Sequence, residues 1–411
     1  MVKEKISVPY CLPLIDGPVI KEVNDTLVNT GWLTTGPKVK SFESELATYC
    51  GVEKVLAVNS WNSGTQLMLR WFGVKAGDEV IIPAYTYSAT ALAAINIGAK
   101  VIMVDVDTDF NIAAQNIQKA ITTKTKVVIP VDIGGLPCDY FEIEKCLIEN
   151  QHLFMPEHPN QEKLGRPLIL ADAAHSIGAE YEGKKSGSFC DVSVFSFHSV
   201  KNITTGEGGA VCLNLPVPFD NNEVYAYLKH FHLYGQTKSA FDKTKAGSWK
   251  YDIVSPGMKA NMNDVSASIG LSQLRRYESD LLPHRKKIFE KYLNAFDQYS
   301  WAEVPQLQTQ LKKSSAHLFM LRFNNITEEE RDQIILQLTS NKVGTSVHYI
   351  PMPSFTYFKN VGYDIADYPM AYSNYAREIT LPIYNSLKDE QIDYTIEQVL
   401  KAFESVKIKK C

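Results

Sequence analysis

The sequence has no apolar run long enough to cross a membrane. A transmembrane helix needs about 20 consecutive, mostly apolar residues, and no segment of the 411-residue chain approaches that length. The first residues, MVKEKISVPYCLPLIDG, lack the long apolar core of a signal peptide. The formal net charge of −4 lacks the basic excess that marks proteins binding nucleic acids or anionic membranes. We therefore expect a cytoplasmic protein with neither nucleic acid nor membrane as a partner.

Paired cysteines are also missing. The seven cysteines include no C-x-x-C pair, and their odd number and spacing fit neither a zinc site nor a disulfide framework. We expect no bound metal, and reduced thiols that lie mostly in the core. The seven are Cys11, Cys50, Cys138, Cys146, Cys190, Cys212 and Cys411.

What the chain does have is a regular alternation of strand-like and helix-like segments through its first two thirds. Short apolar runs rich in β-branched residues, separated by amphipathic helices such as 63–74, 88–98 and 111–122, predict a mostly parallel sheet covered on both faces. The predicted strands are 54–60, 78–85, 99–107, 125–133, 167–174, 191–197 and 208–214.

The pattern changes after a long helical stretch at 266–299. Predicted strands at 316–325, 343–350 and 376–384 alternate with helices at 327–341 and 388–406, which is typical of an α+β domain. A chain of 411 residues with 45% hydrophobic and 21% charged residues is expected to form two domains. We place a large α/β domain at 15–290 and a small α+β domain at 291–411, with an N-terminal arm at 1–14.

Two strand ends carry the most suggestive charged groups. Asp172 follows the apolar run of PLILADAA, and Lys201 follows that of DVSVFSF. In open α/β sheets, ligands collect at the carboxyl ends of the strands. The pair has two readings, a buried salt bridge or a pyridoxal phosphate (PLP) site, where a lysine forms a Schiff base and an aspartate keeps the pyridine nitrogen protonated.

Three flanking residues favour the cofactor reading. Tyr87 follows another strand end and could stack on a pyridine ring, His175 could reach the ring hydroxyl, and Ser196 could bind the phosphate. Each also has an ordinary explanation: a core tyrosine, a capping histidine and a turn serine. Their joint occurrence at successive strand ends is what favours a site.

Several stretches of the chain resemble the DegT/StrS family, which consists of fold-type-I PLP enzymes that are mostly nucleotide-sugar aminotransferases. The resemblance runs nearly end to end, and the pattern S-F-x-x-x-K-x-x-x-x-G-E-G-G is its specific part. The stretches are GWLTTGPKVKSFESELA, GDEVIIPAYTYSATALAAINIGAKVIMVDVD, ADAAHSIGAEYEGKKSG, FSFHSVKNITTGEGGAV, NMNDVSASIGLSQLRRYE and EITLPIYNSLKDEQIDYTIEQV.

The resemblance implies a role for each site residue. Lys201 would form the Schiff base, Asp172 would contact the ring nitrogen, and His175 would lie beside the ring hydroxyl. Tyr87 would stack on the ring, and Ser196 would bind the phosphate. The expected catalytic residues are thus Lys201, Asp172 and His175, and no metal is expected in the site.

The phosphate-binding turn of the family has two possible matches. The letters favour Ser63-Gly64-Thr65, whereas ungapped spacing from GDEV favours Ser60, Trp61 and Asn62. We prefer the spacing, because a shift of three residues would break the helix register. Trp61 and Asn62 then depart from the usual Gly-Thr, although an asparagine amide can still donate to phosphate.

Two further departures concern the partner subunit and the sugar. Many relatives have asparagine at the position of Lys259, where it reaches the phosphate in the other subunit of a homodimer with shared active sites; Asn261 is the alternative ligand. Pro353 stands where many relatives place a second histidine. Trp32, Thr34, Thr35 and His348 are the expected sugar contacts, with packing of the N-terminal arm as the alternative explanation.

The resemblance therefore implies an aminotransferase that moves an amino group from L-glutamate to a nucleotide-diphosphate keto sugar. GWLTTGPK and VHYIP look most like the branch that aminates C4 of UDP-linked 4-keto-6-deoxy sugars for amino-sugar or polysaccharide biosynthesis. C3 amination of a dTDP-linked sugar is the alternative. A sugar dehydratase would have histidine in place of Lys201, and a non-catalytic PLP-binding regulator would not need the complete set of catalytic groups.

Overall fold

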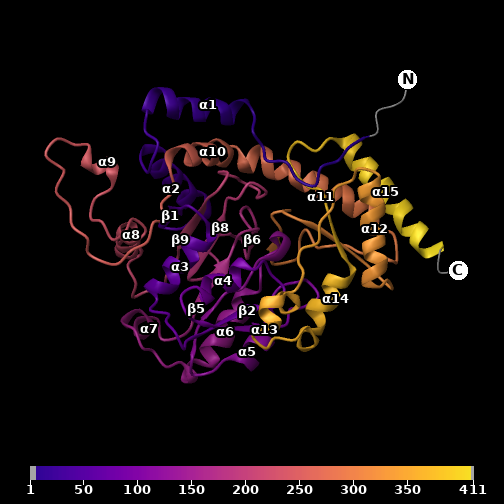
Figure 1. Cartoon of the computed structure of the whole chain (residues 1–411), viewed down its shortest axis with the longest axis horizontal. Helices are drawn as coiled ribbons and strands as arrows, with labels where there is room; N and C mark the ends of the chain where they lie inside the picture. Colours follow the sequence, from indigo (N-terminus) through magenta and orange to yellow (C-terminus); the bar gives the residue numbers. More distant parts are fainter. Residues whose placement is uncertain (1–5, 409–411) are drawn as a thin grey trace.

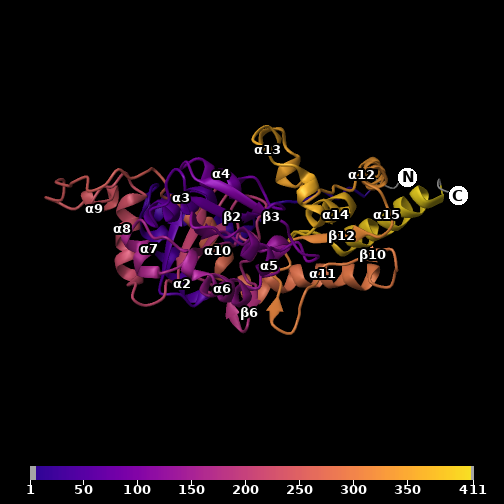
Figure 2. The ribbon, with the colours of Figure 1, turned by 90° about the horizontal axis from the view of Figure 1, so that it is seen from below.

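The computed structural model describes residues 6–408, so residues 1–5 of the predicted arm and residues 409–411, including Cys411, lie outside the described part. The chain forms a large and a small lobe, arranged as an elongated molecule (Figures 1 and 2). The large lobe contains a seven-stranded sheet in the order β1-β9-β8-β5-β4-β2-β3. These strands are β1 (Lys54–Val58), β2 (Glu79–Pro83), β3 (Lys100–Val104), β4 (Thr125–Val128), β5 (Leu168–Asp172), β8 (Val192–Ser196) and β9 (Gly209–Leu213).

The sheet is mostly parallel, which confirms the fold class predicted from the sequence. β2 is parallel to β3 and β4, β4 to β5, and β5 to β8. β9 runs antiparallel to both β8 and β1. Each strand predicted between residues 54 and 214 is present, because buried strands of a parallel sheet are apolar on both faces and therefore stand out in the sequence.

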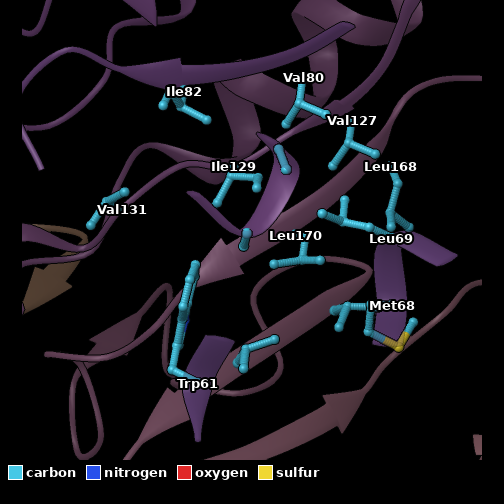
Figure 3. Close-up of a cluster of buried hydrophobic side chains, with 14 of the residues drawn as sticks. Trp61, Met68, Leu69, Val80, Ile82, Val127, Ile129, Val131, Leu168 and Leu170 are labelled. Carbon is cyan, nitrogen blue, oxygen red and sulfur yellow. The ribbon is translucent and has the colours of Figure 1, made fainter. Parts of the chain in front are cut away.

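Helices cover both faces of this sheet. Alternate strand residues point to opposite faces, so Leu56 and Val58 pack in one cluster while Val55 and Ala57 pack in another. The first cluster also contains Trp61, Met68 and Leu69 of α3 (Figure 3). The interior residues of α4 belong to the same cluster. The helices of the large lobe are α1 (Gly17–Asp25), α2 (Pro37–Cys50), α3 (Trp61–Trp71), α4 (Ala89–Ile95), α5 (Ala114–Ala120), α6 (Tyr140–Glu149), α7 (Pro159–Leu164), α8 (Asn221–Phe231), α9 (Ala240–Lys243) and α10 (Asp264–Leu274).

The small lobe builds its own core around the antiparallel sheet β10-β12-β13. Its elements are β10 (Ala302–Glu303), β12 (Phe319–Phe323), β13 (Glu378–Leu381), α11 (Leu282–Phe296), α12 (Glu328–Ser340), α13 (Thr356–Asn360), α14 (Pro369–Arg377) and α15 (Asp389–Ile408). A third sheet, β11 (Lys312–Lys313), β6 (Glu180–Tyr181) and β7 (Lys184–Lys185), joins segments from both lobes.

The packing crosses the predicted boundary at residues 290 and 291 in both directions. Ile288 of α11 and Val8 of the N-terminal arm belong to the small-lobe core, and Val8 forms a bridge with Val343. In the other direction, Met352 and Phe358 pack in the large-lobe core. Contacts between the lobes therefore come from several distant segments.

The prediction of a strand at 343–350 is wrong. This segment holds no strand, and its only pairings among the described residues are bridges at Val343 and Ser346. The ladder stops because the backbone N–H of His348 donates to the carboxyl of Glu378, at 3.0 Å, instead of to a strand carbonyl. The predicted helix at 266–299 is likewise divided into α10, a π-helical segment (Tyr277–Leu281) and α11.

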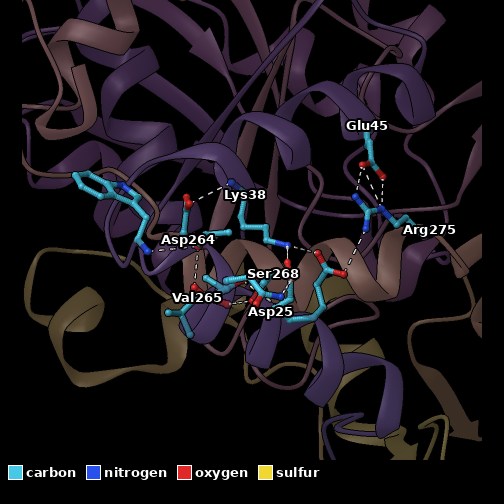
Figure 4. Close-up of polar contacts among 12 residues, drawn as sticks. Asp25, Lys38, Glu45, Asp264, Val265, Ser268 and Arg275 are labelled. Atoms are coloured by element: carbon cyan, nitrogen blue, oxygen red, sulfur yellow. Dashed lines mark hydrogen bonds and ion pairs between the residues drawn. The ribbon is translucent and has the colours of Figure 1, made fainter. Parts of the chain in front are cut away.

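A polar network fastens α1, α2 and α10 together (Figure 4). α2 follows Gly36, which has no side chain to cap the helix, and the buried carboxylate of Asp264 accepts the backbone N–H groups of Gly36, Lys38 and Val39 instead. The ammonium group of Lys38 pairs with Asp25. No helix among residues 6–408 has the length and apolar character needed to span a bilayer.

Candidate active site

A cavity of about 470 Å³ lies at the carboxyl ends of β5 and β8, where they face the small lobe. Parallel strands bring their carboxyl ends to one edge, which is why residues distant in sequence meet there. The lining residues are Tyr10, Cys11, Ser60, Trp61, Asn62, Thr86, Tyr87, Ala89, Val131, Asp172, Ala174, His175, Ser196, His198, Val200, Lys201, Glu207, Gly208, His317, Leu318, His348, Tyr349, Leu381 and Ile383.

Asp172 ends β5 and is buried at the floor of this cavity. Burial raises the pKa of its carboxyl to about 6, although two donated hydrogen bonds favour the charged form. The hydroxyl of Thr90 donates to Oδ2 at 2.9 Å, and the N–H of Ala174 donates to Oδ1 at 3.2 Å. Both carboxyl oxygens are thus oriented, and the group can accept a further proton donor from the cavity.

Lys201 faces the same cavity from the loop that follows β8. Its backbone N–H donates to the carbonyl of His198 at 2.9 Å, which forms a tight turn at the strand end. Burial lowers the pKa of the amine to about 8, against the opposing effect of the Asp172 carboxylate. An amine with a lowered pKa is a better nucleophile and a better base at neutral pH.

The tautomer of His175 follows from its hydrogen bonds. The backbone N–H of Gly134 donates to Nδ1 at 3.3 Å, so the proton of the neutral ring is on Nε2. Nε2 lies 3.0 Å from the hydroxyl of Tyr349 and donates to it. Burial holds the pKa of His175 well below its usual range, so the ring stays neutral and acts as a hydrogen-bond donor toward the cavity.

The first turn of α3 forms the anion-binding end of the cavity. Ser60 caps the helix, with Oγ accepting the N–H of Ser63 at 3.1 Å, and Ser60, Trp61 and Asn62 line the cavity. A helix N-terminus presents unpaired N–H groups and a partial positive charge. These backbone donors fit a phosphate group.

The Ser63-Gly64-Thr65 alternative does not fit the geometry. None of these three residues is among those that line the cavity. Thr65 is fully buried, and Gly64 packs against the side chains of Val211 and Val194. The geometry therefore favours the turn given by the spacing, whose role toward a phosphate stays a prediction.

The glycines of GEGG allow a close approach between strands. A Cβ on Gly209 would lie 2.8 Å from the backbone nitrogen of Trp61 and 2.7 Å from the carbonyl of Phe195. Only glycine lets the β9 backbone pass this close to the start of α3.

Tyr87 and Ser196 also line the cavity. Tyr87 lies at its mouth with 62% of its surface exposed, and its ring is 5.9 Å from that of Tyr349. Ser196, the last residue of β8, accepts the N–H of His198 at 3.4 Å. The roles of both residues toward a cofactor stay predictions.

Most of the predicted sugar and cross-subunit residues lie elsewhere. Of Trp32, Thr34, Thr35 and His348, only His348 lines the cavity. The indole of Trp32 donates to the carbonyl of Thr35, and the Thr35 hydroxyl donates to the carbonyl of Met262. These contacts pack the N-terminal segment against the loop before α10, which is the alternative explanation given above for these residues.

Lys259 and Asn261 do not line the cavity of their own chain. The amide of Asn261 donates to the Thr35 hydroxyl at 2.6 Å. The side chain of Lys259 is exposed and has no ion-pair partner among residues 6–408. Their proposed contact with a partner subunit stays a prediction.

Sequence reasoning missed several residues of the site. Thr90 orients Asp172 from α4, while Tyr349 and His317 contact His175 from the small lobe. Thr90 follows Tyr87 by three residues, one helical turn, and Tyr349 is adjacent to His348; both spacings were visible signals. Nothing in the sequence pattern marked His317.

Comparisons with known proteins point to one family. The family model described as the DegT/DnrJ/EryC1/StrS aminotransferase family matches residues 14–400. The spore coat polysaccharide biosynthesis protein SpsC of Bacillus subtilis is 36% identical over 97% of both chains. Aminotransferases of this family use PLP.

Solved structures are similar over the same length. The putative sugar aminotransferase Spr1654 of Streptococcus pneumoniae, in its PMP-form, is 40% identical with a TM-score of 0.93, covering 97% of this chain and 100% of that one. PseC of Helicobacter pylori, an aminotransferase involved in pseudoaminic acid biosynthesis, is 28% identical with a TM-score of 0.85, covering 97% and 100% of the two chains. These matches confirm the resemblance predicted from the motifs: the chain belongs to the DegT/DnrJ/EryC1/StrS aminotransferase family.

Proposed function

We propose that this protein is a PLP-dependent aminotransferase that transfers the amino group of L-glutamate to a nucleotide-linked keto sugar. The observation that carries the proposal is the pairing of a buried carboxyl, Asp172, with a lysine of lowered pKa, Lys201, in one cavity. The family supplies the reaction class, and the geometry supports the role proposed for each residue.

The residues present fit the cofactor. When bound, PLP supplies an aldehyde that condenses with amines and a ring that takes up electrons. Asp172 would hold a proton on the ring nitrogen, and the Nε2–H of His175, which donates to Tyr349 in this structure, would donate to the ring hydroxyl instead. Ser60, Asn62 and Ser196 would bind the phosphate at the start of α3.

Lys201 would have two successive tasks. Its amine would hold the cofactor, and once an incoming amino acid takes its place, the free amine would move the proton of the amino acid Cα. Its lowered pKa supports both tasks, because an amine must lose a proton before it can act as a nucleophile or a base. Tyr87, at the mouth, would cover the ring and limit water access.

For the acceptor we propose C4 of a UDP-linked 4-keto-6-deoxy sugar, with C3 of a dTDP-linked sugar as the alternative. The support comes from the segments GWLTTGPK and VHYIP and from similarity to SpsC and PseC, whose names place them in polysaccharide and pseudoaminic acid biosynthesis. Glutamate as donor rests on the family resemblance.

We further propose that the working unit is a homodimer with shared active sites. Exposed apolar side chains are unusually dense on two segments, and such patches mark interaction surfaces. Val28, just after α1, is 69% exposed, and Trp249, in the loop after α9, is 75% exposed. Trp32 contacts Phe241 edge to face at 5.1 Å, which joins the two segments. The loop stands away from the body of the large lobe (Figures 1 and 2).

The test is incubation of the PLP-loaded protein with glutamate and a panel of UDP- and dTDP-linked keto sugars, followed by mass spectrometry. A product that gains an amino group identifies the acceptor, and NMR of that product distinguishes C3 from C4. Formation of 2-oxoglutarate without any aminated sugar across the panel would contradict the proposed acceptor class.

A further inference from the structure

A fully buried carboxyl that the mechanism above does not use lies behind His348. Glu378 begins β13 and has no exposed surface. Its Oε2 accepts the backbone N–H of His348 at 3.0 Å, and its Oε1 shares a hydrogen bond with the hydroxyl of Thr380. The same hydroxyl lies 2.9 Å from Nδ1 of His348. Glu378, Thr380 and His348 thus form a chain of hydrogen bonds that ends at the cavity.

A single proton decides the polarity of this chain. The Thr380 hydroxyl can donate to Glu378 or to His348, but not to both. If Glu378 is ionised, the hydroxyl donates to the carboxylate and accepts from Nδ1–H, which leaves Nε2 of His348 as an acceptor. If Glu378 is protonated, the carboxyl donates to the hydroxyl, the hydroxyl donates to Nδ1, and the ring proton moves to Nε2.

We propose that Glu378 and Thr380 are positioning residues that set which ring nitrogen of His348 carries the proton, so that Nε2 accepts a hydrogen bond in the cavity when Glu378 is ionised and donates one when it is neutral. Nε2 is the nitrogen left for the cavity, because Nδ1 is engaged by Thr380.

The other neighbours of His348 do not decide its tautomer. The hydroxyl of Tyr10 lies 3.4 Å from Nδ1 and 3.5 Å from Nε2, so it favours neither nitrogen. Burial and the charge of Lys201 lower the pKa of His348 to about 3, and the ring therefore carries one proton at neutral pH. Tyr349 packs its ring edge to face, at 4.9 Å.

The groups around Glu378 place its ionisation near the working range. Burial raises the pKa of its carboxyl to about 8, while Arg331 of α12 and Arg322 of β12 lower it. Tyr85 and Tyr10 face the same carboxyl with neutral hydroxyls, since burial raises the pKa of both well above its usual value. We therefore expect the neutral form at pH 6 and the ionised form at pH 9.5.

The first experiment measures the tautomer directly. The full-length, PLP-loaded protein is labelled with ¹⁵N-histidine, and the His348 imidazole signals are assigned by their loss in His348→Asn. We expect the proton on Nε2 at pH 6 and on Nδ1 at pH 9.5. A His348 tautomer that does not change between pH 6 and 9.5 would overturn the proposal.

Three variants test whether these hydrogen bonds set the tautomer of His348 or only support the local structure. In Glu378→Gln the amide oxygen accepts the His348 N–H and the amide nitrogen donates to Thr380, so His348 should keep its Nε2 proton at every pH. Thr380→Val should abolish the change of the His348 tautomer between pH 6 and 9.5, which we call the pH step. Thr380→Ser keeps a hydroxyl at this position and should retain the pH step. A pH step that persists in Thr380→Val would also overturn the proposal, and this pair remains decisive if Glu378→Gln fails to fold.

A second experiment links the tautomer to substrate, and it rests on the proposed function. For whichever keto sugar of the panel is accepted, KM should change with pH in the wild type by roughly tenfold or less, the worth of one hydrogen bond, and should lose this step in Glu378→Gln while kcat follows the wild-type pH profile. If no sugar is accepted, the proposed function fails while the NMR result still stands. A pH step in KM that is retained in Glu378→Gln would show that His348 does not contact the sugar through this chain.

Discussion

At the scale of single residues, the reactivity of Lys201 follows from where its amine lies. Burial lowers its pKa to about 8, and it shares the cavity with Asp172. We predict that borohydride reduction of the PLP-loaded protein fixes the cofactor mass to the peptide that contains Lys201. Lys201→Ala should bind PLP reversibly and lose transamination by at least about a thousandfold. Peptide mass spectrometry checks the first result, and a label on another lysine would contradict the assignment.

Asp172 should matter for the rate of the reaction as well as for binding. Asparagine keeps the shape but cannot hold the ring nitrogen protonated, so both half reactions should slow in Asp172→Asn by about a hundredfold or more. Single-turnover absorbance with glutamate measures the first half reaction. Thr90→Val is the matched control: it removes the donor at 2.9 Å but keeps the carboxylate, and it should have a smaller effect. Wild-type rates in reconstituted Asp172→Asn would remove this residue from the mechanism.

The sequence could identify the site residues at strand ends, but not the residues that orient those site residues. Asp172 and Lys201 follow long apolar runs, so their position at the edge of the sheet was predictable. Thr90 and Tyr349 become relevant only when α4 and the small lobe meet β5. Glu378 lies in a strand whose pattern gives no sign that its carboxyl faces His348. Such contacts depend on tertiary packing, which a single sequence does not specify.

At the scale of elements, Glu43 holds three pieces of the large lobe together. Its carboxyl, on α2, accepts the N–H of Ala57 in β1 and the hydroxyl of Tyr225 in α8, each at 2.8 Å. Burial raises its pKa from 4.5 to about 7. A carboxyl whose pKa is raised by folding stabilises the fold fully below its unfolded pKa, and this contribution is lost as the pH rises toward 7.

We therefore predict that the stability of Glu43→Gln, relative to that of the wild type, increases as the pH increases. Glutamine cannot ionise, so the difference in Tm, variant minus wild type, should be more positive at pH 8.5 than at pH 5. Thermal unfolding of the PLP-free protein at both values measures it. Glu45→Gln, on the same helix but in a partly exposed pair with Arg275, is the control and should show a much smaller dependence. The same Tm difference at both pH values would contradict the raised pKa.

Elements of the large sheet were predictable because each strand is apolar and is flanked by turn residues. The segment 343–350 has similar composition yet forms no strand, since its backbone is engaged by a side chain from β13. Local propensity cannot register that competition. At the start of α3, spacing from a neighbouring motif pointed to Ser60, which caps the helix and lines the cavity, although the letters pointed three residues further.

At the scale of the whole molecule, the two lobes are tied by segments from both ends of the chain. Val8 joins the small-lobe core, and Tyr10 and Cys11, just after it, line the cavity. The site is therefore built from the N-terminal arm, the sheet edge and the small lobe together. A boundary drawn at one position in the sequence cannot describe such an arrangement, because the packing segments alternate along the chain.

The expected phosphate site lacks a positively charged side chain of its own, and a second subunit could supply one. A phosphate carries close to two negative charges, whereas Ser60, Asn62 and Ser196 supply donors but no full positive charge. The backbone carbonyl of Ala260 accepts the N–H of Asn59, which brings Lys259 close to this turn in space, and the Lys259 side chain is exposed to solvent. A lysine in that position is available to a neighbouring subunit.

We predict that Lys259 completes the phosphate site of the partner. Lys259→Ala should then weaken PLP affinity without dissociating the dimer, as measured by PLP titration and by light scattering, while Lys119→Ala, an exposed lysine on α5, should change neither. Mixing inactive Lys201→Ala chains with impaired Lys259→Ala chains should restore about one working site per heterodimer, because the intact Lys201 of one chain meets the intact Lys259 of the other. If heterodimers form and Lys259→Ala is impaired but activity is not restored, the lysine serves the site of its own chain.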